Sequence, residues 1–334
     1  MMSKTIKVAA IQMDVNQAPK AERLDRALRW VDEGVRSGAQ LVVLPELFNT
    51  GYAYTDANYQ LSEPVDGMTG TWMKKTAARL RIHLAGSLML QEKDDIFNAL
   101  LLFSPSGQRW RYDKNYPWAW ERGYFRDGRG ITVAHTELGD IGMMICWDAG
   151  HLALWKQYAG KVDMMLMASC PPNGADPVYR FPDGSTFTID DFGAWMASMK
   201  HEGRHVFGSL IGEQTAWLGV PALNSGACGQ FRSTVPNSAP LVWGFSLFVP
   251  RLVKHFTHAS HLNIACDVIP SCKIFDAQGT VIAERTQDEG EGLVMAEVVI
   301  ADSKPVPRAH QPSAQLPYSV YFNADVLVPF LMKS

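Results

Sequence analysis

Residues 1–45 alternate short apolar runs with one amphipathic segment. Lys7–Met13 and Leu41–Pro45 are apolar runs of the kind found in strands that are covered on both faces. Ala21–Ser37, between them, carries leucine and valine at helical spacing and is followed by Gly38, a typical helix stop. Two strands joined by a helix usually lie parallel in one sheet. The sequence therefore predicts an α/β fold in which helices cover a sheet.

Strands outnumber helices along the rest of the chain, which favours one mixed α/β domain with strands paired in both directions. Helices are expected at Thr71–Leu80, near Leu152–Tyr158 and at Phe192–His201. Asn98–Phe103 and Arg109–Tyr112 flank a Ser-Pro-Ser-Gly turn and are expected to form a hairpin. The remaining expected strands are His83–Leu90, Ile131–His135, Ile141–Cys146, Met164–Ser169, Val206–Ile211, Ser271–Phe275, Val281–Glu284 and Leu293–Val299.

Three segments do not follow this pattern of strands and helices. Pro171–Thr188 is rich in proline, glycine and aspartate, and a loop is expected there. Phe231–Pro270 is long and irregular, so we interpret it as an insertion, at about 231–270, in a domain that spans residues 1–303. It could form a lid, a pocket wall or an oligomer contact. Residues 304–334 contain five prolines and are expected to wrap the surface or to contact a partner subunit.

Charge and cysteine content argue against several function classes. The formal net charge is −3 and no dense stripe of lysine and arginine occurs, so nucleic-acid binding is not expected. The N-terminus lacks the pattern of a secretory signal. The apolar stretch Pro240–Val253 is too short to span a bilayer, although an interfacial or partner-facing role stays open. Five cysteines without framework spacing indicate reduced thiols in the cytoplasm. No convincing phosphate loop occurs, and no cofactor is implied.

Three residues with chemically useful side chains each follow a predicted strand. Cys146 ends the run that begins at Ile141, where a sharp turn would present its thiol and the N–H of Trp147 could meet an oxyanion. A free thiol is only about a few per cent thiolate at neutral pH, so it needs a base or a cation nearby. Glu46 and Lys114, each after another strand, could supply these. Taken singly, each residue also fits an inert cysteine, an exposed carboxylate or a solvated lysine.

With their flanks, these residues resemble the motifs of the nitrilase, or carbon–nitrogen hydrolase, superfamily. The matching stretches are VAAIQM near the N-terminus, LVVLPELFNTGY around Glu46, YDKNYPWAWERGYFRDG around Lys114 and GDIGMMICWD around Cys146. The resemblance covers about residues 6–230 and 271–300. It implies a four-layer α-β-β-α sandwich that forms a homodimer or larger homo-oligomer. It also implies that Glu46 is the general base and acid, Lys114 stabilises the oxyanion and Cys146 is acylated, while Glu121 orients Lys114 or the substrate.

The resemblance implies metal-independent hydrolysis of a non-peptide C–N bond, but the substrate stays open. Trp147 is followed by Asp148, whereas true nitrilases usually have Trp-Glu, which favours an amide or carbamoyl substrate over a nitrile. Acyl transfer to an acceptor other than water stays an alternative. The proline and glutamate that the family often carries shortly after the cysteine are absent. Aromatic residues near the motifs are candidates for substrate binding, although such residues more often pack: Tyr52, Trp118 and Trp120.

A zinc-protease pattern competes with this interpretation. His201, Glu202 and His205 match H-E-x-x-H. Gly203 would weaken the required helix, and Val206–Ile211 is expected to be a strand, so the two imidazoles would not share a face. We therefore regard a zinc metallohydrolase as a remote alternative and expect no metal.

Two further readings differ in the role of the thiol. A Cys–His dyad would use His135 or His151 as its base, whereas strand packing and a helix start are the expected roles of these histidines. A silent homologue acting as a binding subunit is disfavoured because the glutamate, lysine and cysteine are all present. The other cysteines are expected to be core or loop thiols: Cys170, Cys228, Cys266 and Cys272.

Overall fold

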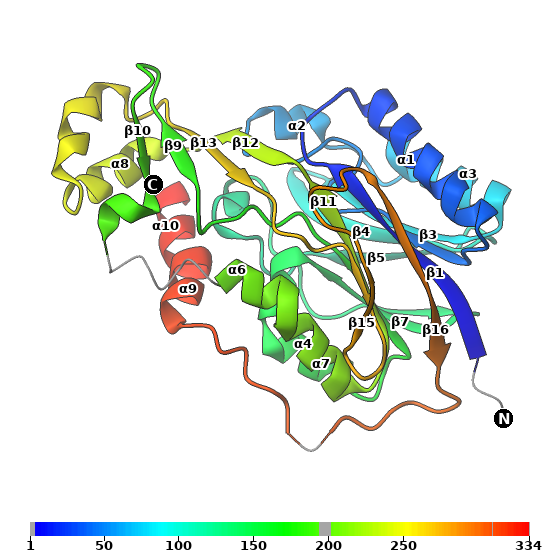
Figure 1. Ribbon diagram of the computed structural model, residues 1–334. Helices are drawn as coiled ribbons and strands as arrows, with labels where there is room; N and C mark the ends of the chain where they lie inside the picture. The colour runs from blue at the N-terminus through cyan, green and yellow to red at the C-terminus, as the bar shows by residue number, and fades with distance from the viewer. Residues whose placement is uncertain (1–3, 194–201, 309, 334) are drawn as a thin grey trace.

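The computed structural model describes residues 4–193, 202–308 and 310–333 (Figure 1). Its central strands form one 12-stranded sheet that divides into two halves, joined where β1 pairs in parallel with β11. The first half runs in the order β5 (Arg109–Asp113), β4 (Asp95–Phe103), β3 (His83–Glu92), β2 (Leu41–Val43), β1 (Lys4–Asp14) and β16 (Gly292–Ile300). The second runs β6 (Val133–Thr136), β7 (Gly139–Ile145), β8 (Met164–Ala168), β11 (Ala222–Cys228), β14 (Lys273–Phe275) and β15 (Val281–Glu284).

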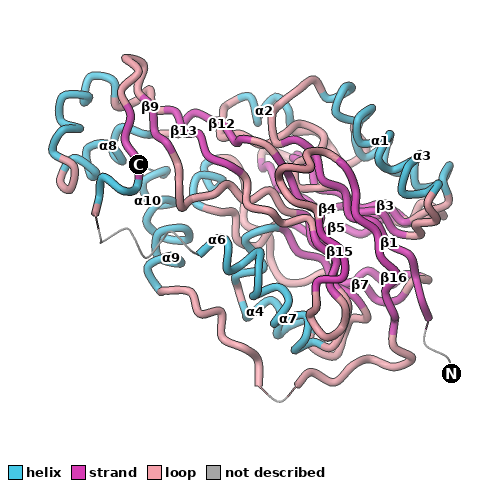
Figure 2. Tube along the Cα trace, viewed as in Figure 1, coloured by secondary structure: helices cyan, strands magenta, loops and turns pink. Residues whose placement is uncertain are grey.

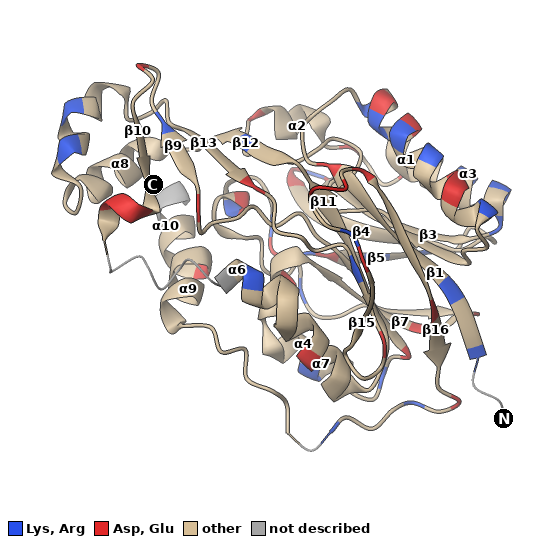
Figure 3. Cartoon of the chain, in the orientation of Figure 1, with Lys and Arg blue, Asp and Glu red and all other residues tan. Residues whose placement is uncertain are grey.

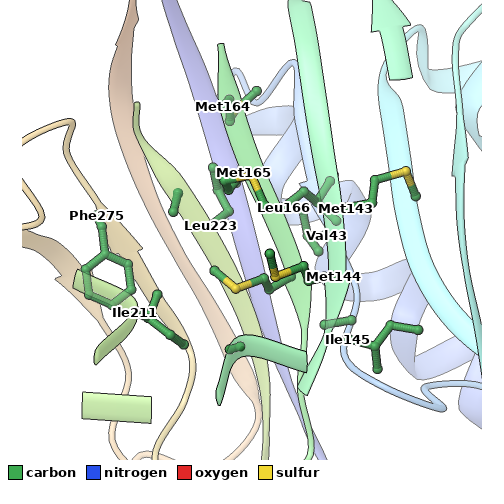
Figure 4. Close-up of a cluster of buried hydrophobic side chains, with 14 of the residues drawn as sticks. Val43, Met143, Met144, Ile145, Met164, Met165, Leu166, Ile211, Leu223 and Phe275 are labelled. Atoms are coloured by element: carbon green, nitrogen blue, oxygen red, sulfur yellow. The ribbon is translucent and has the colours of Figure 1, made fainter. Parts of the chain in front are cut away.

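Side chains of β1 alternate between two cores, as strand geometry requires. Val8 and Ala10 enter the core that the two halves share, which also holds Met143 and Leu166. Figure 4 shows this methionine-rich cluster between the strands. Ile11 points the other way, into a second core beneath α1 (Lys20–Arg36) and α3 (Met68–Leu80). These two helices carry much of the charge seen in Figure 3.

Helices on the opposite face complete the expected four-layer α-β-β-α sandwich (Figure 2). They are α4 (Leu152–Tyr158), α6 (Glu202–His205), a π-helical turn η5 (Val206–Leu210) and α7 (Ile211–Leu218). The prediction of a strand at Val206–Ile211 is wrong. Val206, Phe207, Leu210 and Ile211 are all buried against the shared core, and their i, i+4 spacing is that of one helix face. A six-residue apolar run fits a strand and a buried helix equally well by pattern alone.

The two segments expected to be loop-like contain a second, four-stranded sheet. Its order is β10 (Thr186–Thr188), β9 (Val178–Arg180), β13 (Asn263–Asp267) and β12 (Gln230–Thr234). The helices α8 (Ser238–Ser246) and η6 (Pro250–His258) lie between β12 and β13. The interpretation of Phe231–Pro270 as irregular is therefore wrong, and so is a continuous loop over Pro171–Thr188. Each of these four strands is too short to be recognised in the sequence without the strand that it pairs with.

After β16, the chain crosses the outer surface of α7 and ends in α9 (Tyr318–Phe322), the π-helical η7 (Asn323–Leu327) and α10 (Val328–Lys333). Trp217 Nε1 donates to Arg308 O at 2.8 Å and Gln214 Nε2 donates to Pro312 O at 2.9 Å, which fastens the extension to the sandwich. Short helical elements also occur at α2 (Ala57–Leu61), η1 (Ala119–Gly123), η2 (Cys146–Gly150) and η3 (Ile189–Phe192). Within the described residues, no helix combines the length and apolarity needed to cross a membrane. The helix expected at Phe192–His201 falls mostly outside the described residues.

Candidate active site

Cys146 stands at a sharp turn between β7 and η2, as its position after a buried strand predicted. Its φ angle is +48°, a left-handed conformation that is strained for a residue with a side chain. The carboxylate of Asp148 stabilises the turn, because it accepts hydrogen bonds from the N–H of Ile145 at 3.2 Å and the N–H of Tyr116 at 2.8 Å. Tyr112 OH donates to the same carboxylate at 2.7 Å. Asp148 is completely buried, and its hydrogen bonds hold the turn at Cys146 in place.

Glu46, Lys114 and Glu121 meet in one buried cluster, although they follow different elements of the chain. Lys114 Nζ lies 2.8 Å from Glu46 Oε1 and 2.6 Å from Glu121 Oε2, and none of the three side chains reaches solvent. Glu121 also accepts a hydrogen bond from Tyr52 OH and, at 2.5 Å, one from the N–H of Trp118. Two carboxylates thus hold the ammonium group from two sides, which fixes its position.

Glu46 is also held by groups that the sequence motifs did not single out. Asn98 Nδ2 donates to Glu46 Oε1 at 2.7 Å, and the N–H of Cys170 donates to Glu46 Oε2 at 2.8 Å. Ser87 Oγ in turn donates to Asn98 Oδ1 at 2.9 Å and accepts the N–H of Leu47 at 3.0 Å. Asn98 interrupts an otherwise apolar run, and this was the available signal. No pattern in the sequence points to the backbone of Cys170.

The electrostatics of the cluster keep the thiol neutral and the lysine charged. Burial, reinforced by Glu46, raises the pKa of the Cys146 thiol well above its usual range, although Lys114 and the N–H of Cys170 oppose this shift. Burial alone would lower the pKa of Lys114, but Glu121 and Glu46 outweigh it and raise that pKa. Burial also raises the pKa of Glu121, against the effect of Lys114. A thiolate would therefore form only as its proton leaves for a nearby acceptor.

One cavity of about 210 Å³ reaches Cys146. The candidate substrate-binding residues Tyr52, Trp118 and Trp120 all line it, and Trp147 does as well. Glu46, Lys114 and Glu121 lie behind this lining rather than in it. Cys146 is thus the member of the cluster that a bound molecule meets first. Asp148 does not line the cavity, so it cannot separate amides from nitriles by direct contact.

The C-terminal extension lies against this site. Asp325 Oδ1 accepts a hydrogen bond from Trp147 Nε1 at 3.1 Å, and Asp325 Oδ2 lies 3.5 Å from His151 Nε2. Tyr321 OH donates to Gly150 O at 2.7 Å. Val320 and Ala324 also line the cavity. The extension therefore supplies one wall of the site from the same chain, whether or not it also contacts a partner subunit.

The competing histidines are engaged elsewhere. His205 Nε2 lies 2.7 Å from Ala314 O, and its Nδ1 lies 2.8 Å from Ser209 Oγ. His201 lies outside the described residues. The helix continues through His205, so the strand expected there does not argue against a zinc site. Both ring nitrogens of His205, however, face protein atoms. In the described part of the chain, no group of three or more His, Cys, Asp or Glu side chains could hold a metal ion.

Neither candidate for a Cys–His dyad is poised as a base. His151 precedes α4 as predicted, stacks on Tyr116 at 3.5 Å between ring centroids, and has its pKa lowered to about 3, mainly by burial. His135 is 76% exposed and its Nδ1 lies 2.7 Å from Asp140 Oδ1, so the expectation that it packs within the strand is wrong. The four remaining cysteines are buried thiols, as expected.

Protonation of Asp148 provides a pH-dependent prediction. Burial raises the pKa of this carboxyl from 3.8 to about 6, against the smaller opposing effects of Lys114, Tyr112 and two N–H groups. Between these pH values the folded protein retains a proton that the unfolded chain releases, so stability falls as pH rises. Relative to Asp148→Asn, the free energy of unfolding should fall by about 2 kcal/mol between pH 4 and pH 7. Urea denaturation of both proteins measures this difference, and parallel pH profiles would contradict it.

Comparisons with known proteins agree with the arrangement of the motifs. The family model described as carbon-nitrogen hydrolase matches residues 7–177, just over half of the chain. The protein belongs to the carbon-nitrogen hydrolase family. Similar structures of the family include the carbon-nitrogen hydrolase from Helicobacter pylori G27, with 15% identity, a TM-score of 0.64 and coverage of 88% of this chain and 89% of that one. An amidase mutant from Nesterenkonia sp. AN1, with acrylamide added at its active site cysteine, has 14% identity and a TM-score of 0.61, covering 93% and 95% of the two chains. At these identities the likeness shows the shared fold.

The names of proteins with similar sequences describe different reactions. A nitrilase from Pyrococcus abyssi is 28% identical over 147 residues, covering 43% of this chain and 56% of the relative. A cyanide hydratase from Penicillium rubens is 26% identical, covering 56% and 62%. An omega-amidase from Danio rerio is 28% identical, covering 50% and 63%. Each match spans less than two thirds of the relative's own length, and membership of the family does not select among these reactions.

Proposed function

We propose that this protein hydrolyses a non-peptide C–N bond, of the amide or carbamoyl type, through an acyl-enzyme on Cys146. The proposal rests on where the residues of the cluster lie relative to the cavity. Cys146 lines the cavity, while the paired Glu46 and Lys114 lie directly behind it with a separation of 2.8 Å. A nucleophile, a proton acceptor and a fixed cation are the three groups that acyl transfer needs.

In the first half of the reaction, the Cys146 sulfur attacks the carbonyl carbon and its proton passes to Glu46. Because the pKa of the thiol is raised, this transfer accompanies the attack instead of preceding it. The negative charge that develops on the carbonyl oxygen is stabilised by the Lys114 ammonium and the N–H of Trp147. Glu121 and Tyr52 act through Lys114, because they hold the position of the ammonium group.

In the second half, Glu46 returns the proton to the leaving nitrogen, the C–N bond breaks and a thioester remains on Cys146. A water molecule then attacks the thioester carbon while Glu46 accepts one of its protons. The thiolate leaves, takes up that proton from Glu46 and restores the resting site, with the free acid released. Every proton is thus returned, and the cycle consumes only the substrate and one water.

Two alternatives use the same residues. A nitrile would give a covalent thioimidate that takes up water and releases ammonia before the thioester forms. An amine or thiol that intercepts the thioester would turn the reaction into acyl transfer. The names of the relatives include nitrilase and omega-amidase, which supports testing both substrate types.

Intact-protein mass spectrometry during turnover tests this function. With a panel of amides, carbamoyl compounds and nitriles, the native protein should show a transient mass increase equal to the acyl group, which decays to free acid. Cys146→Ala should show no adduct and should lose activity at least about 10³-fold. Full activity in Cys146→Ala would refute the proposal. Product that partitions to an added amine at the expense of free acid would identify acyl transfer.

A further inference from the structure

The cavity at Cys146 is walled by aromatic and aliphatic side chains from distant parts of the chain. Tyr54 comes from the loop before α2, Trp120 from η1 and Val328 from the C-terminal extension. The small sheet and α8 contribute Phe231 and Phe245, among others. Phe245 packs edge-on against Phe192 at 4.7 Å between ring centroids, so this wall is continuous. The segment interpreted as an insertion is therefore a wall of the pocket.

No charged side chain faces this cavity among the described residues that line it, and no histidine does either. Against these described residues, a carboxylate or ammonium group on a bound molecule would lose its hydration without gaining an ionic partner, which disfavours its binding. An apolar group would instead exchange water for aromatic contacts. The described part of the wall therefore favours an uncharged, apolar group.

The volume of the cavity indicates the size of the group that it can enclose. A closed apolar cavity of about 150 Å³ is known to hold benzene. The cavity here, at about 210 Å³, has room for one ring and a short linker to the reacting carbon. Behind the lining of the cavity, Glu46 is only 3% exposed and Lys114 is fully buried. The leaving nitrogen must reach Glu46 to be protonated, so only a small leaving group fits there.

Resting on the function proposed above, we infer that the substrate is a primary amide whose acyl part is uncharged and apolar, of the size of a phenylalkyl group. The leaving group is then ammonia, which Glu46 protonates within its enclosed space. The apolar acyl part lies between the aromatic wall of the small sheet and the C-terminal helices. Substrates with a second carboxylate, or with a bulky group on nitrogen, are excluded by desolvation and by space respectively.

Three matched substrates test this inference on the unmodified protein: 3-phenylpropanamide, the monoamide of glutaric acid and N-butyl-3-phenylpropanamide. The value of kcat/KM for 3-phenylpropanamide should exceed that of each of the other two at least about 100-fold. Faster or equal turnover of the glutaric acid monoamide would overturn the apolar assignment. Equal turnover of the N-butyl compound would overturn the small leaving group.

A charge placed in the wall gives a second measurement. Phe245→Lys should reduce the preference for 3-phenylpropanamide over the glutaric acid monoamide at least about tenfold, because the ammonium group can pair with the carboxylate. Leu241→Lys, at another lining position of α8, should act in the same direction if Phe245→Lys fails to fold. The matched control is Leu247→Lys, just beyond α8, where the side chain is 80% exposed and does not line the cavity. A preference that is unchanged in both wall variants would contradict the inference.

Failure of the inferred substrate class and failure of the proposed function would give different experimental results. If the native protein forms a Cys146 adduct with the glutaric acid monoamide more readily than with the phenyl compound, the chemistry holds and the substrate class is wrong. If none of the amides, carbamoyl compounds or nitriles of the panel gives an adduct or turnover, the proposed function itself fails.

Discussion

Glu46→Gln should lower kcat/KM by about 10²–10⁴-fold while the protein stays folded. Glutamine can still accept hydrogen bonds from Lys114 and Asn98 through its oxygen, but it can neither take the Cys146 proton nor return it to the leaving nitrogen. Its amide nitrogen would face the N–H of Cys170, so one buried contact is lost at a cost of about 1–3 kcal/mol. Steady-state kinetics at several pH values, with the thermal midpoint recorded in parallel, measure both effects.

Glu63→Gln is the matched control for that substitution. Glu63 is another buried carboxylate with a dense set of partners: Thr69, Asn49 and Lys20. It does not contact the cluster at Cys146, so Glu63→Gln should lose stability but keep its turnover rate. If Glu46→Gln kept more than about a tenth of the native activity, Glu46 would not be the proton carrier.

Lys114→Met should reduce both activity and stability. Removal of one oxyanion donor typically lowers kcat by about 10²–10³-fold. In addition, Glu46 and Glu121 would remain buried without the ammonium group between them, and breaking such a pair costs about 3–5 kcal/mol. One of the two carboxyl groups is expected to take up a proton in response, so the loss of stability should be smaller at low pH.

The double variant Lys114→Met/Glu121→Gln separates the two roles of Lys114. Replacing Glu121 with glutamine removes one of the uncompensated charges, so part of the lost stability should return. Activity should not return, because the cation that faces the developing oxyanion is still missing. Chemical denaturation and kcat on the same preparations provide the comparison. Recovery of activity in the double variant would show that Lys114 only neutralises its neighbours.

The central strands, and the positions of Glu46, Lys114 and Cys146 after them, could be predicted because both depend on short-range patterns. Continuous apolar runs mark β2 and β8, whose residues are all buried in the structure. Glu46, Lys114 and Cys146 each come just after the end of a strand, β2, β5 and β7 respectively. Strand ends in one layered fold lie at one edge, so order along the chain translated into closeness in space.

The π-helical turn over Val206–Leu210 could not be predicted from local sequence. There the choice between helix and strand depended on which face the shared core covers, and the pattern of a short apolar run does not contain that information. The small sheet was missed for a related reason. β9 and β13 lie more than eighty residues apart in the sequence, and their pairing joins the two halves of the small sheet.

The sequence by itself determined where the central strands lie along the chain and which glutamate, lysine and cysteine follow them, because side-chain chemistry and apolar periodicity are local properties. Tertiary structure alone decided how those groups are held. Asn98 and the N–H of Cys170 reach Glu46 from elements 52 and 124 residues away. The same holds for the cavity, whose walls come from the sandwich loops, the small sheet and the C-terminal extension. Hydrogen bonds and packing act over distances in space, and only the complete fold brings these distant residues within reach of one another.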